Sequence, residues 1–305
     1  MTIKKPQLTN SHQLSPTFTN SHQLSPTLTN SHQLSPKMSD KKRIPVLSLS
    51  GGMDSSALLL HSIAGFGEEP VYSLSFDYGQ KHKIELEKLQ SNLVLLRSKG
   101  FQIRHAVVDL SVLGTLFHSS LTTGSWSSPE GHYAEDSMKE TVVPNRNAIF
   151  SSIIYGYALS LAKENECETS ICLGVHSGDH AIYPDCRPEF YSAISQAFRV
   201  GNWDNELVDF YLPYLDGDKE SILRDAMNCC LQLGVDFDEY FANTNTSYSP
   251  DEQGRASGKT GSDIERILAF DALGKKDPVE YQEPWEVVVQ RARELEKKQA
   301  EVEDE

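Results

Sequence analysis

The sequence has no long hydrophobic run and no excess of positive charge, and each absence excludes a class of protein. No stretch of about 18 apolar residues occurs among its 305 residues, so we expect no transmembrane helix. The N-terminus lacks a charged segment followed by an apolar one, the pattern of a signal peptide. We therefore expect a cytoplasmic protein without membrane contact. The net charge of -15 argues against a nucleic-acid partner, although a local basic pocket for a small anion is compatible with it.

Cysteine is scarce, and no C-x-x-C pair is present. This usage is typical of reduced thiols in a reducing compartment, lying in a core or near a site and forming no disulfide framework. The five cysteines are Cys167, Cys172, Cys186, Cys229 and Cys230.

The first 37 residues have too little apolar surface to bury a core. Residues 9–38 repeat the motif TNSHQLSP three times, which predicts a disordered low-complexity tail over 1–37. The repeated histidines are better explained by this composition than by a metal site, and Met38 is an alternative start of the chain.

From Ile44 onward, short apolar runs alternate with helical periodicity, which predicts a doubly wound α/β fold with a mostly parallel, Rossmann-like sheet. We expect one α/β domain over 38–242 and a C-terminal part over 243–305, with a polar loop and a charged helix from Trp285. The expected strands are 44–49, 70–76, 102–110 and 169–175. The expected helices before residue 243 are 55–65, 83–100, 148–165, 188–201 and 219–234. Ligands of such sheets bind at the carboxyl ends of the strands.

The segment Ser50–Ser55, SGGMDS, follows the first strand directly and opens a helix. Paired glycines permit a sharp turn with exposed N–H groups, and a helix start offers further unpaired donors, so this is a place to hold phosphate. It is not the Walker pattern, which needs Gly-Lys-Ser/Thr after a longer loop. A plain strand-turn-helix link, capped by Ser50 or Asp54, is the alternative.

Three further polar clusters follow at strand ends or helix starts: FDYGQKH at 76–82, VPNRN at 143–147 and GVHSGDHAIYPDCRPEF at 174–190. Each alone has an ordinary explanation, such as a surface position for His82 or a helix-start ion pair for Arg146. SGGMDS followed by these clusters resembles first the N-type ATP pyrophosphatases and then, more specifically, the QueC family of 7-cyano-7-deazaguanine (preQ0) synthases. The resemblance covers about 44–270.

The resemblance implies an ATP-dependent C–N ligase that adenylates 7-carboxy-7-deazaguanine, forms an amide with ammonia and dehydrates the amide to the nitrile with a second ATP. It also implies a homodimer, and Mg²⁺ near Asp54. The residues that it places around ATP are Ser48, Leu49, Ser50, Gly51, Gly52, Met53, Asp54, Ser55, Ser56, Phe76, Tyr78, Gln80 and His82.

The expected catalytic set is Asp54, Lys219, Arg146, His180, Asp185 and Arg187. Lys219 matches a lysine of the family and would neutralise phosphate charge, although a surface lysine at a helix cap is the alternative. Arg146 and Arg187 suit a bidentate grip on a carboxylate. Asp185 or Glu189 would read the N–H groups of the guanine-like edge, and His180 would move protons as ammonia attacks. The sequence leaves these individual roles open.

The family's C-terminal part normally holds four zinc-binding cysteines, and here the four matching positions are Ser247, Ser257, Thr260 and Asp263. Three hydroxyls and a carboxylate do not form the thiolate site that Zn²⁺ prefers, so we expect no metal there. In one explanation, hydrogen bonds now hold the loop, with Asp263 capping the helix that follows.

In the other explanation, the altered site accompanies a new acceptor, so that the activated carboxyl passes to another amine, such as a protein's. QueC-like proteins occur in antiphage defence as well as in queuosine biosynthesis, which gives this alternative a precedent in the family. A third alternative is a binding module that keeps nucleotide affinity only, against which the intact SGGMDS, Lys219 and Arg146 argue.

Overall fold

The computed structural model describes residues 42–80, 84–117, 119–122, 130, 136–180 and 183–303. These residues belong to one compact unit, Leu34–Glu305. The repeat tail predicted over 1–37 lies outside the described residues.

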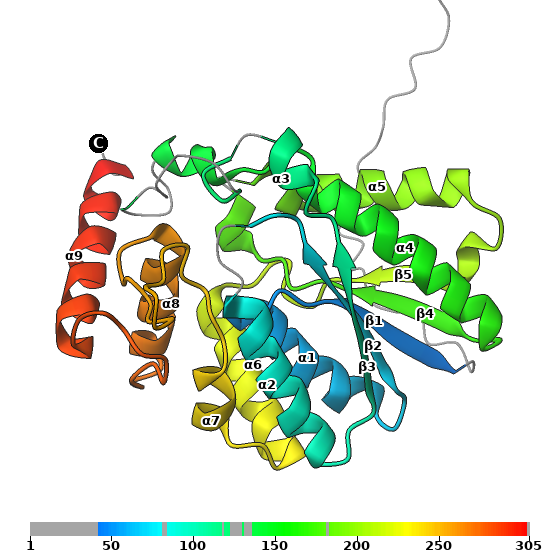
Figure 1. Ribbon diagram of the computed structural model, residues 1–305, viewed down its shortest axis with the longest axis horizontal. Coiled ribbons are helices and arrows are strands. Elements are labelled where there is room, and N and C mark those ends of the chain that lie inside the picture. The colour runs from blue at the N-terminus through cyan, green and yellow to red at the C-terminus, as the bar shows by residue number, and fades with distance from the viewer. Residues whose placement is uncertain are drawn as a thin grey trace, which may run out of the picture. The chain divides into compact units, whose positions relative to one another are not determined.

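A five-stranded parallel sheet forms the centre of this unit (Figure 1). Its strand order is β3-β2-β1-β4-β5, an order typical of the doubly wound sheet that the alternating pattern predicted. Four strands fall where they were expected, whereas β5 was missed because it has only four residues and no continuous apolar run. The strands are β1 Arg43–Ser48, β2 Val71–Asp77, β3 Ile103–Asp109, β4 Glu168–Cys172 and β5 Val208–Tyr211.

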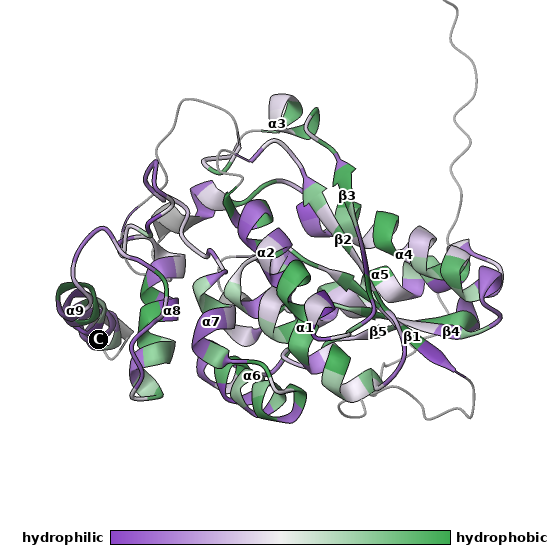
Figure 2. Ribbon diagram, turned by 60° about the horizontal axis from the view of Figure 1, so that its bottom comes forward, coloured by the Kyte–Doolittle hydropathy of each residue, from purple (hydrophilic) through white to green (hydrophobic). Residues whose placement is uncertain are grey.

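Helices cover both faces of the sheet, so the doubly wound fold is confirmed (Figure 1). The helices form two groups, and each group packs over its own apolar core. Figure 2 shows α1 as largely hydrophobic, consistent with its place against β1 and α6. The first group is α1 Met53–Phe66, α2 Ile84–Ser98 and α6 Lys219–Leu233, and the second is α4 Arg146–Glu164 and α5 Pro188–Gly201.

The C-terminal part adds α7 Phe237–Ala242, α8 Gly261–Ala272 and α9 Trp285–Glu303. Ile264 and Ile267 of α8 pack against Val288 and Ala292 of α9, while the remainder of α9 is mostly hydrophilic (Figure 2). The charged C-terminal helix is therefore confirmed. Within the described part of the chain, no helix combines the length and apolarity that crossing a membrane requires.

Short elements complete the described fold. They are α3 Leu113–Leu116 and the 3-10 turns η1 Asp136–Thr141, η2 Ser177–His180, η3 Pro184–Cys186 and η4 Asn205–Leu207. All five cysteines are buried outside any disulfide, as expected.

Candidate active site

The loop between β1 and α1 forms one wall of a cavity at the carboxyl ends of the strands. Gly51 has φ +92°, a left-handed conformation that suits glycine, and its Cα approaches the backbone of Glu85 in α2. The Ser55 hydroxyl accepts the N–H groups of Ser50 (3.2 Å) and Gly51 (3.3 Å), which fixes the turn. The loop therefore presents a tight backbone turn and the N-terminus of α1 to the cavity, as an anion site requires.

We expect Gly51→Ala to destabilise the protein by about 2 kcal/mol and to abolish nucleotide binding. A Cβ at this position would lie 2.1 Å from the carbonyl oxygen of Glu85, and backbone cannot move aside as a flexible side chain can. Urea unfolding and calorimetric titration with ATP measure both effects. Gly65→Ala in α1 is the matched control, since its Cβ meets nothing within 4 Å and alanine favours the helix. Equal stability of the two variants would contradict the geometry.

Lys219, at the start of α6, reaches into the phosphate loop. Its Nζ lies 2.9 Å from Asp54 Oδ2, 3.1 Å from His176 Nε2 and 3.5 Å from Glu265 Oε2. A capping box between Asp218 and Ser221 fixes the helix start and hence the lysine. Burial tends to raise the pKa of Asp54, but the charges of Lys219 and His176 outweigh burial and hold that pKa below its usual value. Asp54 is therefore ionised at neutral pH.

The second carboxylate oxygen of Asp54 is suited to a cation. Asp54 Oδ1 is buried and has no hydrogen-bond partner among the described residues. A buried carboxylate oxygen without a donor, beside a loop that suits phosphate, fits the hard oxygen ligation that Mg²⁺ prefers. Asp54 thus fits both the lysine and the expected metal.

Aromatic rings lie around Arg146, the first residue of α4, which lines the same cavity. The guanidinium lies 5.9 Å from the centroid of the Tyr78 ring and 5.7 Å from that of Tyr183. Phe76 and Phe150 stack nearby at 4.1 Å. A planar cation among flat rings suits a planar heterocycle that carries a carboxylate.

Glu85, in the first turn of α2, also lines the cavity and was not predicted as a site residue. Burial raises its pKa to about 7, although the charge of Arg146 and a hydrogen bond with Gln80 both act to lower the pKa. It can therefore exchange a proton near neutral pH. From sequence it reads as one of two acidic residues that favour a helix start, so only its burial distinguishes it.

We expect Glu85→Gln to flatten the pH dependence of stability. The folded-state pKa of about 7 lies above the reference value of 4.5, so the folded protein binds the extra proton between these values. Stability should therefore fall as pH rises through this window, by about 2 kcal/mol, and the glutamine variant should lack this fall. Urea unfolding at pH 5 and 7.5 measures it, with exposed Glu87→Gln as control. Identical slopes in the wild type and Glu85→Gln would refute this.

The predicted site residues separate into three groups. Those that line the cavity are Ser48, Leu49, Ser50, Gly52, Asp54, Ser55, Phe76, Tyr78, Gln80, Arg146 and Lys219. Those that are not part of its lining are Gly51, Met53, Ser56, Asp185 and Arg187. His82 and the side chain of His180 lie outside the described residues.

The predicted residues that do not line the cavity have identifiable places in the fold. Met53 and Ser56 are fully buried, and Gly51 shapes the turn. Asp185 Oδ2 accepts the backbone N–H of Asn147 at 3.3 Å, so this carboxylate oxygen is engaged at the start of α4. Arg187 is the residue that precedes α5.

The C-terminal part completes the cavity, which the sequence did not predict. The Asn245 N–H donates to the Gly51 carbonyl (3.0 Å), and the Met53 N–H donates to the Thr246 hydroxyl (3.4 Å). Glu265 of α8 reaches Lys219 from the same side. His176 was also missed, although it lay within a cluster quoted for its polar residues, because its contact with Lys219 joins residues far apart in sequence.

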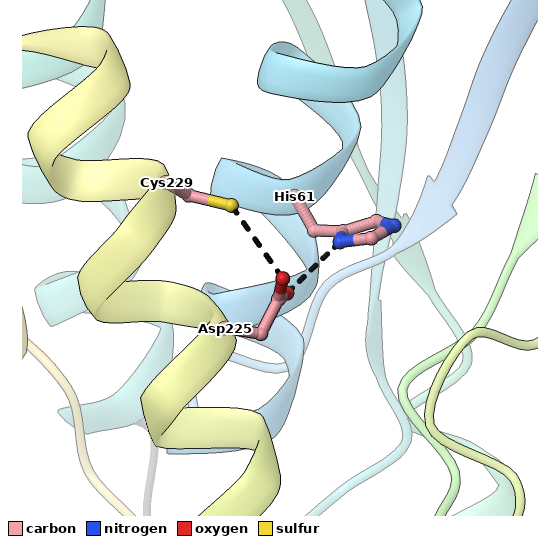
Figure 3. A group of neighbouring side chains, drawn as sticks. All are labelled: His61, Asp225 and Cys229. Carbon is pink, nitrogen blue, oxygen red and sulfur yellow. Dashed lines mark hydrogen bonds and ion pairs between the residues drawn. The ribbon is translucent and has the colours of Figure 1, made fainter.

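A separate cluster of metal-ligating side chains lies between α1 and α6: His61, Asp225 and Cys229, whose side chains point toward one another (Figure 3). Hydrogen bonds already engage its polar atoms. His61 Nδ1 lies 2.9 Å from Asp225 and Nε2 lies 2.7 Å from the Tyr211 hydroxyl, while Tyr214 donates to Asp225 at 2.6 Å. Burial and the Asp225 carboxylate raise the pKa of Cys229 to about 11, which disfavours the thiolate that binds metal. The cluster is best explained as a polar contact between two helices.

Together, the parallel sheet, the glycine turn and the Asp54–Lys219 pair define an α/β domain with a candidate phosphate site. A sequence profile of the family described as queuosine biosynthesis protein QueC matches residues 44–274. The 7-cyano-7-deazaguanine synthase of Caldicellulosiruptor saccharolyticus is 43% identical over 78% of this chain and 95% of the relative. That of Methanoregula boonei is 45% identical over 78% of this chain and 98% of the relative. The chain therefore belongs to the QueC family, as the motifs predicted, and is an enzyme.

Two solved structures are distantly similar. The U34-tRNA thiolase NcsA from Methanococcus maripaludis has a TM-score of 0.37 and 13% identity, covering 84% of this chain and 72% of that chain. The NMN synthetase from Francisella tularensis has a TM-score of 0.36 and 12% identity, covering 83% and 86%. Similarities this weak carry no argument about the site.

Proposed function

We propose that the protein is an ATP-dependent C–N ligase that adenylates 7-carboxy-7-deazaguanine with release of pyrophosphate, forms the amide as ammonia displaces AMP, and uses a second ATP to dehydrate the amide to the nitrile of preQ0. The observation that supports this most is that one cavity holds both groups of residues. The Asp54–Lys219 pair and the glycine loop line one part of it, which we call the phosphate end, and Arg146 with its aromatic neighbours lines another part, which we call the aromatic end. An ATP α-phosphate and a substrate carboxylate must meet between such ends for adenylation.

The phosphate end carries the charge stabilisation. A carboxylate is a poor electrophile, and adenylation attaches a leaving group while pyrophosphate departs. The positive dipole end of α1 and the Lys219 ammonium would stabilise charge that develops on the departing pyrophosphate. Asp54 would hold Mg²⁺ through Oδ1 while Oδ2 keeps Lys219 in place, and the metal when bound supplies charge shielding of the triphosphate.

The aromatic end would bind and orient the base. Arg146 would hold the substrate carboxylate by two hydrogen bonds, and the rings of Tyr78 and Phe76 would contact the heterocycle. Glu85, with its raised pKa, would accept a proton from ammonia as the C–N bond forms, since the attacking nitrogen must lose one. Water exclusion by these rings would protect the adenylate from hydrolysis.

Mass spectrometry of the protein with ATP, Mg²⁺ and 7-carboxy-7-deazaguanine, with and without ammonium, tests the proposal. Release of AMP together with the free nitrile is the expected result. A base that stops at adenylate or amide, or a mass increase on a polypeptide, would favour the alternative ligase with another acceptor, such as a protein in antiphage defence. No pyrophosphate release from any of these mixtures would support a binding module and reject both ligase assignments.

A further inference from the structure

The loop that precedes α8 is held by a single carboxylate. Asp263 Oδ2 accepts hydrogen bonds from the hydroxyls of Ser257 (2.6 Å), Thr260 (2.9 Å) and Ser247 (3.1 Å). The backbone N–H groups of Lys259 and Thr260 reach the same oxygen at 3.2 Å. All four side chains are buried. We call Ser247, Ser257, Thr260 and Asp263 the carboxylate hub.

The hydroxyls of the hub act in both directions. The Ser247 hydroxyl accepts the N–H of Ser257 (3.3 Å), and the Ser257 hydroxyl accepts the N–H of Lys259 (3.2 Å), while each donates its own proton to Asp263. Backbone donors of an irregular buried loop are thereby satisfied through side chains that converge on one anion. Asp263 lies in the first turn of α8, where the helix dipole stabilises a negative charge.

These positions do not fit Zn²⁺. They offer hydroxyls that serve as donors and one carboxylate oxygen already surrounded by five donors, whereas zinc prefers thiolates and imidazoles in a tetrahedron. The expectation that Asp263 caps the helix is corrected in one respect: Thr260 is the N-cap, and Asp263 completes the capping box from the third helical position.

We propose that the Asp263 carboxylate is a metal-free staple, which gathers Ser247, Ser257 and Thr260 around one anion and so closes the loop onto α8 as a central metal ion would. The convergence on a single buried point from two loop segments and one helix carries this inference. It concerns folding and metal content and does not depend on the substrate.

The first test compares Asp263→Asn with Asp271→Asn on the same helix. Asparagine keeps one acceptor oxygen but removes the negative charge on which five donors converge, so the melting temperature should fall by about 6–10 °C. Asp271 pairs with the largely exposed Arg293, and its variant should shift by under about 2 °C. The milder Ser257→Ala, which removes the shortest of these bonds, should lower it by about 3 °C. Equal melting temperatures for Asp263→Asn, Ser257→Ala and Asp271→Asn would overturn the proposal.

The second test measures metal. Elemental analysis of the purified wild type should find less than about 0.1 zinc per chain, and EDTA should leave its melting temperature unchanged. The quadruple variant Ser247→Cys, Ser257→Cys, Thr260→Cys, Asp263→Cys should bind one Co²⁺ with thiolate charge-transfer absorption, and EDTA should then lower its melting temperature. Stoichiometric zinc in the wild type, or a folded quadruple variant that binds no Co²⁺, would overturn the staple.

Discussion

Lys219→Met is expected to reduce ATP-dependent pyrophosphate release by about 10³-fold. The substitution removes the one ammonium that lies between Asp54, His176 and Glu265 at the phosphate end of the cavity. Preorganised charges at such positions contribute several kcal/mol to transition-state stabilisation because the site excludes water. Pyrophosphate release under saturating ATP measures the effect, and Lys163→Met, at a half-exposed ion pair with Asp204, is the control.

A double variant separates this effect from folding. Lys219→Met alone leaves the buried Asp54 carboxylate without its closest cation, so its pKa should rise and some stability should be lost. Asp54→Asn combined with Lys219→Met should regain stability without regaining activity. If the single variant keeps more than about a tenth of wild-type activity, Lys219 does not act on the phosphates.

Arg266→Met is expected to lower the free energy of unfolding by about 3–5 kcal/mol, the usual cost of removing one partner of a buried ion pair. Arg266 Nε lies 2.6 Å from Asp277 Oδ2 and Nη2 lies 2.9 Å from Oδ1, and both side chains are almost fully buried. The same guanidinium donates to the hydroxyls of Thr244 (2.8 Å) and Thr246 (3.1 Å). Its loss would leave Asp277 as an uncompensated buried charge.

Chemical denaturation of three variants tests this. Arg293→Met, at an exposed ion pair with Asp271, should cost less than about 1 kcal/mol. Arg266→Met with Asp277→Leu should recover much of the loss, since the pair is replaced by apolar groups. A double variant as unstable as the single one would show that the threonine bonds, rather than the ion pair, carry the energy.

Arg266 also shows why part of the site escaped prediction. Its partner Asp277 lies eleven residues further on, beyond the end of α8, so no local pattern links the two residues. Glu265 and His176 were missed for a similar reason, because both meet Lys219 only through the tertiary fold. Asp185 was predicted from sequence as a site residue, yet it does not line the cavity, and its carboxylate accepts the backbone N–H of Asn147.

The homodimer, the cytoplasmic location and the absence of a nucleic-acid partner stay predictions. Sedimentation velocity of the purified chain would measure the first of these directly.

The sequence by itself determined the alternating α/β order, the glycine turn after the first strand and the family, because these depend on local periodicity and on contiguous motifs such as SGGMDS. The tertiary structure decided what surrounds Lys219, the place of Glu85 and the convergence on Asp263. The contact of Lys219 with Asp54 joins residues 165 apart in the sequence. The place of Glu85 and the convergence on Asp263 depend on burial that no local pattern records. Two serines, a threonine and an aspartate become a staple only when the fold brings them to one point.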